Sequence, residues 1–156
     1  MREILFRGKT TKKDDNKAFN NIWVEGDLVH AGISGIYIHP QANTFVVDNE
    51  LARLVVMHEV IPESIGQFTG LFDKYQKKIF EGDIIQLGED EDYNWGFNIG
   101  VVKFGEGTFD SGIYRYTGFF YEDKNGNIDH NALYNLGEDW EKCKVIGNIH
   151  DNPELL

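Results

Sequence analysis

The central stretch Gln67-Phe68-Thr69-Gly70-Leu71-Phe72 leads through Asp73–Lys78 into Ile79-Phe80-Glu81-Gly82-Asp83-Ile84-Ile85. It consists of short runs of aliphatic and aromatic side chains separated by polar residues. Such runs, bounded by turn-forming residues, are typical of strands joined as a hairpin. We therefore predict a hairpin around Asp73–Lys78. Because this turn lacks Gly, we expect a type I turn or a longer connection.

The same alternation of short β-branched or aromatic runs with Gly, Asn and Asp continues in both directions, so the sequence predicts a mainly β protein with little helix. The further predicted strands are Glu3–Arg7, Ile22–Val29, Gly35–His39, Thr44–Asp48, Arg53–Ile61, Asp83–Leu87, Phe97–Phe104, Gly112–Tyr121 and Cys143–Ile149. Arg53–Ile61 is apolar on both faces, which predicts a strand covered on both sides. Helical signals are limited to short turns near Asn131–Leu136 and Gly137–Trp140.

Pro62 follows this long predicted strand and suggests a division of the chain. We predict a β-rich N-terminal region over residues 1–62 and a second region over residues 63–156. A short echo links the two, because Trp23–Val29 and Ile79–Ile85 both read apolar, Glu-Gly-Asp, then two aliphatic residues. We interpret the echo as one turn-into-strand device used twice.

The segment Asp123-Lys124-Asn125-Gly126-Asn127 carries a second turn signal. Asn-Gly tolerates positive φ at both central positions, so the segment predicts a hairpin. Its alternating oxygen side chains also resemble a calcium-binding loop. That motif needs Gly at its sixth position and an acid at its twelfth, where this chain has Ile128 and Tyr134. A hairpin is therefore the preferred interpretation.

The charge of the chain restricts its partners. Lys and Arg number 15 against 26 Asp and Glu, so the net charge is -11. Duplex nucleic acid is normally bound by neutralising several phosphates, which an acidic body disfavours. Two basic clusters are exceptions: residues 1–17, with six basic and three acidic groups, and the trio Lys74, Lys77 and Lys78.

The setting is also constrained. No apolar run approaches the ~20 residues of a membrane span, and residues 1–9 do not resemble a signal peptide. The single Cys143 cannot form an internal disulfide. We therefore expect a reduced, cytoplasmic environment without a membrane association.

Catalytic motifs are lacking in the sequence. His58-Glu59 has no second His at helical spacing, and His58 on an apolar strand is better explained as a core residue. The other histidines, His30, His39, His130 and His150, show no metal-ligand spacing. Cys143 lies between Lys142 and Lys144, which could activate a thiol, but a buried small hydrophobe is the preferred interpretation. The sequence predicts no enzyme, no cofactor and no metal; an enzyme built from scattered histidines and carboxylates is the weakest alternative.

Aromatic residues gather on one predicted strand, which carries Tyr114, Tyr116, Phe119, Phe120 and Tyr121. In a small β-structure most of these rings fill the core. Any rings that face outward would suit protein contacts or the stacking of single-stranded bases.

Three stretches resemble the YopX-like family of phage and prophage proteins: Pro62–Lys74 with Ile79–Ile85 in the centre, Arg2–Gly8 at the start, and Val145–Leu156 at the end. The resemblance implies a C-terminal β-barrel of the SH3 type, an origin in a Firmicute phage or prophage, and a function that is uncharacterised. One departure concerns the first hairpin, where Tyr75-Gln76 stands in place of the Asn-Gly usual in the family.

Two functions follow as hypotheses. The first is a non-enzymatic accessory protein of a phage that binds an unknown phage or host protein, or assembles with itself. The alternative is a protein that contacts nucleic acid through residues 1–17, the Lys74–Lys78 turn and exposed aromatics. Candidate binding residues are Gln67, Thr69, Glu81, Asp83, Tyr114 and Tyr116. The first four could instead bond the backbone of their turns.

Overall fold

The computed structural model describes residues 3–11, 21–40, 44–47, 50–53, 57–88, 99–109, 114–129 and 143–156. These residues form β-strands and short 3₁₀ turns, which confirms the mainly β class. The chain divides into two compact units, Met1–Gln67 and Phe68–Leu156. The boundary expected after residue 62 falls in the 3₁₀ turn η3 (Pro62–Ser64), shortly before this division. The helical turns predicted between residues 131 and 140 lie outside the described residues.

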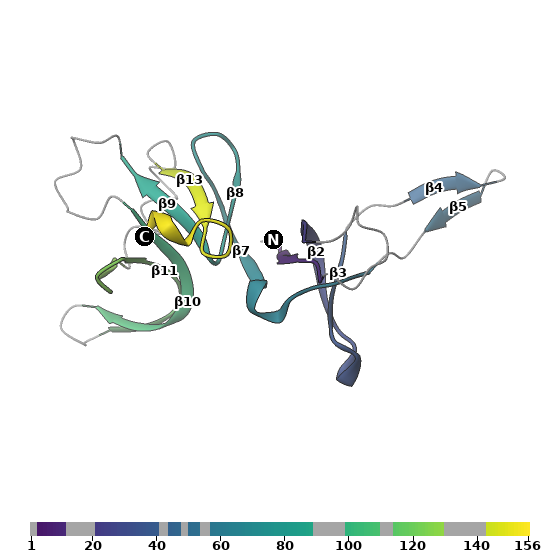
Figure 1. Ribbon diagram of the computed structural model, residues 1–156, viewed down its shortest axis with the longest axis horizontal. Coiled ribbons are helices and arrows are strands. Elements are labelled where there is room, and N and C mark those ends of the chain that lie inside the picture. Colours follow the sequence, from purple (N-terminus) through teal and green to yellow (C-terminus); the bar gives the residue numbers. More distant parts are fainter. Residues whose placement is uncertain are drawn as a thin grey trace. The chain divides into compact units, whose positions relative to one another are not determined.

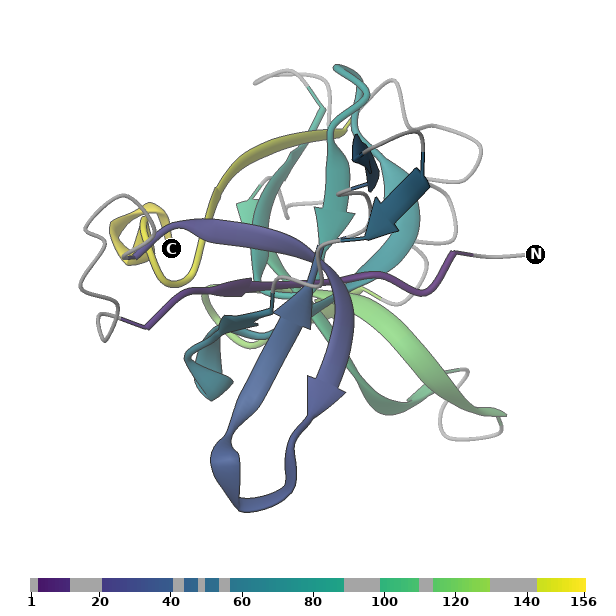
Figure 2. The same cartoon turned by 90° about the vertical axis from the view of Figure 1, so that its right-hand side faces the viewer.

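The first unit contains an antiparallel sheet with the strand order β6-β3-β2-β1. Its strands are β1 (Phe6–Lys9), β2 (Trp23–His30), β3 (Ile36–His39) and β6 (His58–Glu59). A 3₁₀ turn, η2 (Gly32–Ser34), closes the β2–β3 hairpin, which Figure 2 shows in full. Strands β4 (Thr44–Val47) and β5 (Glu50–Arg53) form a separate pair. The first two residues of β7 (Gly66–Phe72) pair with β1.

The prediction of one strand over Arg53–Ile61 is wrong at Met57, and residues 54–56 of that prediction lie outside the described residues. Arg53 ends β5, Met57 lies in no strand and is 48% exposed, and β6 consists of His58 and Glu59 alone. Both residues of β6 are half-buried, so His58 is not a fully buried core residue. Apolar residues on both faces were the basis of the prediction, but composition alone does not tell which of them the fold covers.

The interpretation of the Glu-Gly-Asp echo is also wrong. Gly26 lies in the middle of β2, where a Cβ atom would clash with the His39 carbonyl oxygen. Glycine is needed there for the close approach of the backbone at His39. Gly82, by contrast, has a φ of 80° and lies in the turn between two strands. The same three residues therefore serve two different backbone conformations.

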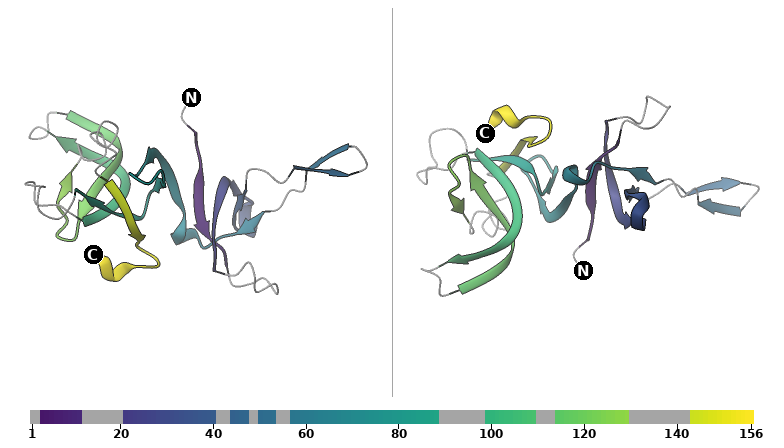
Figure 3. Two further views of the ribbon diagram at one scale, coloured as in Figure 1. Left: turned by 90° about the horizontal axis from the view of Figure 1, so that it is seen from above. Right: turned by 60° about the horizontal axis from the view of Figure 1, so that its bottom comes forward.

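The second unit combines a hairpin with a five-stranded antiparallel sheet of order β12-β11-β10-β9-β13 (Figure 1). The hairpin joins the rest of β7 to β8 (Lys78–Phe80). The sheet contains β9 (Asp83–Leu87), β10 (Ile99–Phe109), β11 (Tyr114–Asp123), β12 (Ile128–Asp129) and β13 (Cys143–Asn148). Strands β10 and β11 are long and strongly bent (Figure 3). The last strand returns to pair with β9, and the chain ends in the 3₁₀ turn η5 (Pro153–Leu155).

The core of the second unit is formed by both of these parts. It consists of Ile79, Ile85, Leu87, Val102, Tyr121, Cys143 and Val145, with Leu71 and Phe119 packed against it. Ile79 and Leu71 come from the hairpin and the others from the sheet. Burying these side chains removes apolar surface from water. Each Å² of buried apolar surface stabilises the folded state by about 25 cal/mol, and this is the main stabilising contribution. The backbone of Gly82 joins further segments, because its N–H donates to the Val102 carbonyl and its carbonyl accepts from Ile149.

Candidate functional site

Two hairpin turns of the second unit have the same hydrogen bonds. In the first, Asp73 N donates to Lys77 O and Gln76 N donates to Asp73 O, at 2.8 and 2.9 Å. In the second, Asp123 N donates to Asn127 O and Gly126 N donates to Asp123 O, at 2.9 and 3.1 Å. In each turn the fourth residue has positive φ: 63° at Gln76 and 79° at Gly126. This pattern is typical of a type I turn followed by a left-handed residue.

The first turn therefore carries backbone strain at Gln76. Left-handed backbone costs a residue with a Cβ atom about 1 kcal/mol or more, whereas Gly adopts it freely. We expect Gln76→Gly to stabilise the protein by about 0.5–1 kcal/mol after the greater freedom of Gly in the unfolded chain is subtracted. Urea denaturation would measure the change. Gly126→Ala is the matched control and should have the opposite sign; a destabilising Gln76→Gly would contradict the assignment.

The side chain of Asp73 fixes the first turn to the sheet. Its Oδ1 accepts hydrogen bonds from the N–H groups of Tyr75 and Lys77, at 2.8 and 2.9 Å. Its Oδ2 accepts from Val145 N at 3.0 Å, although the two residues are 72 positions apart. Lys74 N adds a bond of 2.9 Å to the Cys143 carbonyl. Because Asp73 is only 1% exposed, these contacts are shielded from water and hold the turn in one place.

A surface of basic and aromatic side chains surrounds this turn. We call it the basic aromatic turn, and it consists of Phe72, Lys74, Tyr75, Lys77 and Lys78. Tyr75 is 66% and Phe72 is 39% exposed. Lys74 Nζ lies 5.4 Å from the centre of the Tyr75 ring. Phe72 packs edge-on against the buried Phe68 with ring centres 5.4 Å apart, and Lys78 is the strand partner of Phe72.

A second surface feature is the edge of β10. Strand β9 pairs with β10 only at Ile99–Val101, and Val102 O then accepts from Gly82 N. Among the described residues, β10 beyond this point pairs only with β11. The polar backbone groups of alternate residues face the same edge, so those of Phe104 and Glu106 face the side opposite β11. We call this segment, Lys103–Glu106, the β10 edge.

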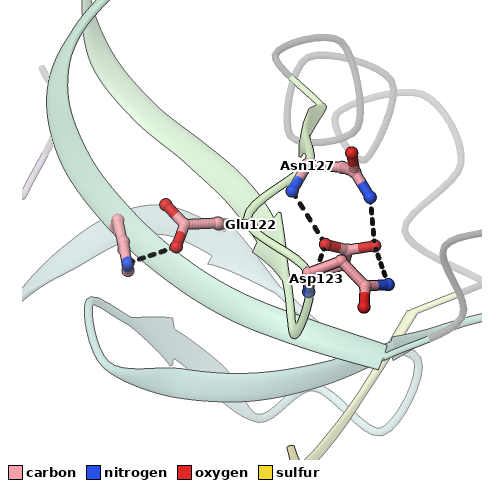
Figure 4. Close-up of polar contacts among 5 residues, drawn as sticks. Glu122, Asp123 and Asn127 are labelled. Atoms are coloured by element: carbon pink, nitrogen blue, oxygen red, sulfur yellow. Dashed lines mark hydrogen bonds and ion pairs between the residues drawn. The ribbon is translucent and has the colours of Figure 1, made fainter.

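An exposed aromatic pair borders the β10 edge. Phe104 is 48% exposed and packs edge-on against the half-buried Phe119 of β11, with ring centres 5.0 Å apart. An ion pair between Lys103 Nζ and Glu122 Oε1, 2.6 Å long, joins the same two strands (Figure 4). These cross-strand contacts keep the two strands together where β9 no longer supports them.

The hairpin predicted at Asp123–Asn127 is confirmed (Figure 4). Asp123 accepts the backbone and side-chain N–H groups of both Asn125 and Asn127. Burial alone would raise the pKa of Asp123, but the hydrogen bonds from Asn127 and Asn125 outweigh it and hold the pKa below its ordinary value. The asparagines thus present amide hydrogens to the carboxylate, which supports a structural role for the loop.

The polar candidates of the central stretch serve mainly the backbone. Thr69 is buried; its Oγ1 donates to Ile79 O at 2.8 Å and accepts from Leu71 N at 3.1 Å. Asp83, 1% exposed, accepts from Phe80 N at 2.8 Å. Both side chains therefore bond the strand β8, as the local alternative predicts. Glu81 is half-buried in the turn between β8 and β9.

The remaining candidates, Gln67, Tyr114 and Tyr116, belong to different units. Gln67 is half-buried and is the strand partner of Phe6 in the first unit. The backbones of Tyr114 and Tyr116 lie in β11 opposite Phe109 and Gly107, and their side chains lie outside the described part of the structure.

The thiol of Cys143 is buried within the core of the second unit. Burial, together with the negative charges of Asp73 and Asp83, raises its pKa from 9.0 to about 12. The thiol is therefore protonated at neutral pH, which supports the interpretation of Cys143 as a small hydrophobe. Within the part of the chain that the structure describes, no three metal-ligating side chains gather, and no helix has the length and apolar character to cross a bilayer.

Sequence reasoning missed Asp73 and the β10 edge. Asp73 carries only a local turn signal in the sequence, whereas its bond to β13 is a property of the tertiary fold. The predicted strands Asp83–Leu87 and Phe97–Phe104 already differ in length, but the residues of β10 that extend past β9 depend on the register between the strands, which the sequence does not specify.

Comparison with known proteins identifies a family and similar solved structures. The sequence model of a family described as YopX protein matches residues 17–156. No curated protein matches the chain. The crystal structure of protein EF1440 from Enterococcus faecalis is similar with a TM-score of 0.57 and 22% sequence identity, covering 100% of this chain and 99% of that chain. At this identity the similarity concerns the fold alone.

Proposed function

The chain belongs to the YopX protein family, and we propose that it is a non-enzymatic module that binds a protein partner or assembles with itself through the β10 edge. The observation that carries the proposal is the backbone of Phe104 and Glu106, which faces away from β11 beside an exposed aromatic ring. A strand edge with unpaired N–H and C=O groups is a template for an added strand.

The strand order supports the SH3-type arrangement that the family resemblance implies. Strands β9 to β12 follow one another as an antiparallel meander, and β13 returns to pair with β9. A fifth strand that returns to the first gives the order of an SH3-type barrel. We include this arrangement, with the β7–β8 hairpin packed on its core, in the proposal.

The roles of the buried polar groups also favour binding over catalysis. Thr69, Asp73 and Asp83 bond backbone groups of their own unit, and the Cys143 thiol is protonated at neutral pH. These groups stabilise the fold. The exposed aromatic side chains Phe72, Tyr75 and Phe104, in contrast, offer the kind of surface that is enriched at protein interfaces.

The partner that we propose is a phage or host protein in the cytoplasm of a bacterial cell. In self-assembly, a second copy of this chain would add a strand to the same edge. Strand addition recognises the partner mainly through the backbone. The ring of Phe104 then supplies an apolar contact next to the added strand.

A proline scan across the hairpin tests the proposal. Glu106→Pro removes a backbone N–H that faces the β10 edge and leaves the hydrogen bonds to β11 in place, so the protein should fold. We expect this variant to lose at least about tenfold in affinity for the partner recovered by cross-linking in infected cells, because an added strand then lacks a central hydrogen bond. Size-exclusion light scattering gives the same comparison for self-assembly.

Thr117→Pro is the matched control, because Thr117 is the strand partner of Glu106, is likewise exposed, and faces the opposite edge of the hairpin. It should leave binding unchanged. Equal binding by both variants would exclude the β10 edge. A strict monomer that retains no partner would exclude the binding function itself.

A further inference from the structure

We propose that the basic aromatic turn binds an acidic segment of a protein partner, a short extended peptide with several Asp or Glu side chains around an aromatic or large apolar residue. The inference rests on the proposed binding function and assigns a second, chemically distinct contact to it. The β10 edge recognises a backbone, whereas this surface would select a sequence.

Hydrogen bonds hold the turn in one conformation before any partner binds. Asp73 accepts three backbone N–H groups at 2.8 to 3.0 Å, and one of them comes from β13. Lys74 N is bonded to the Cys143 carbonyl at 2.9 Å. A partner therefore does not have to meet the conformational cost of ordering the loop, which is where much binding energy is normally lost.

The turn exposes the rings of Phe72 and Tyr75, and a lysine lies near the ring of Tyr75 and another near the ring of Phe68. Tyr75 is 66% exposed with Lys74 Nζ 5.4 Å from the centre of its ring. Phe72 is 39% exposed and is supported from below by Phe68, whose ring centre lies 6.0 Å from Lys78 Nζ. Tyrosine is among the residues that most often supply binding energy at interfaces, because its broad ring has few rotatable bonds.

The turn carries positive charge within an acidic unit. Residues 68–156 carry 8 Lys and Arg against 17 Asp and Glu, a net charge of -9, and three of the eight cations lie in this one turn. Asp73 points its carboxylate inward to backbone N–H groups, Asp83 is buried, and Glu81 is half-buried. Lys74, Lys77 and Lys78 thus concentrate three positive charges in one turn of an acidic unit, and such a cluster is complementary to carboxylates.

A peptide fits this surface better than a nucleic acid does. Three lysines can neutralise about three phosphates, whereas nucleic-acid binding at physiological salt usually needs several more. A long polyanion would also meet the surrounding charge of -9, and a short acidic peptide would not. The aromatic rings alone do not distinguish the two, so the experiment includes both ligands.

The test measures binding of a fluorescein-labelled peptide with four glutamates around one phenylalanine to the full chain at low salt. The double variant Lys74→Glu/Tyr75→Ala should bind at least about tenfold more weakly, since it reverses one charge and removes the exposed ring. The matched control is Lys124→Glu/Asn125→Ala, which changes the same two positions of the turn with the same backbone hydrogen bonds. The control should bind within about twofold of the unchanged protein.

Each other outcome overturns the assignment. No peptide binding, or an equal loss in both double variants, excludes the turn. Tighter binding of a five-nucleotide oligothymidylate, lost in Lys74→Glu/Tyr75→Ala, would assign the surface to nucleic acid instead. Peptide binding that Glu106→Pro abolishes and the turn variant does not would leave the proposed function standing and place all recognition at the β10 edge.

Discussion

Replacing Asp73 with Ala is expected to lower the free energy of unfolding by about 3 kcal/mol or more, a large share of the stability of a small domain. The carboxylate accepts three backbone N–H groups, and the one from Val145 lies in the buried core. Removing it leaves that donor without a partner and frees the turn from β13. Guanidinium denaturation followed by tryptophan fluorescence and circular dichroism measures the change.

Two further variants make this prediction specific. Asp73→Asn keeps the shape, but its amide group turns a donor toward an N–H, so we expect an intermediate loss. Asp123→Ala is the matched control, because Asp123 Oδ1 accepts the same two backbone N–H groups of its turn, while its Oδ2 accepts the side-chain amides of Asn125 and Asn127 in place of a strand N–H. It should cost less than Asp73→Ala. Equal losses would show that the bond to Val145 contributes nothing.

The strands of the fold were largely predictable from local patterns. β9 begins and ends at the predicted residues Asp83 and Leu87, and the hairpin at Asp123–Asn127 follows from Asn-Gly. These features depend on side chains close together in the sequence, where alternation and turn chemistry act directly. The predictions that failed, at Arg53–Ile61 and at the Glu-Gly-Asp echo, required knowledge of which distant segment lies opposite.

The turn at Asp73 shows the limit from another side. A local pattern predicted a hairpin without Gly, but not that Gln76 would adopt the left-handed conformation of Gly126 in the matching turn. Local hydrogen bonds from Tyr75 and Lys77 to Asp73 close this turn, and the bond from Val145, 72 positions away, fastens it to β13.

The candidate site was less predictable than the fold. Polar character selected Thr69 and Asp83 as binding candidates, but both side chains form hydrogen bonds to the backbone. The surfaces that the structure offers, Tyr75 with its lysines and the edge beside Phe104, depend on exposure and on pairing. Neither the exposure of a side chain nor the pairing of a strand edge can be read from one sequence, because both depend on how distant segments pack.

The second large effect concerns Cys143 at alkaline pH. Its pKa is raised from 9.0 to about 12 in the folded protein by burial and by the charges of Asp73 and Asp83. Below pH 9 the thiol is protonated in both the folded and the unfolded chain, so the stabilisation is fully present. Between pH 9 and about 12 only the unfolded chain loses the proton. Stability therefore falls by up to about 1.4 kcal/mol per pH unit, on the order of 4 kcal/mol in total.

Other groups titrate in the same range, so the informative quantity is the difference between the unchanged protein and Cys143→Ala. The variant removes the thiol and leaves a small cavity, which lowers the stability by an amount that does not depend on pH. We expect the unchanged protein to lose its advantage over Cys143→Ala steadily as pH rises from 9 toward 11 in urea denaturation series. Parallel stability curves would mean that the thiol ionises in the fold as easily as in the unfolded chain. That result would contradict the burial of the thiol in the core of the second unit, which is the main cause of its raised pKa.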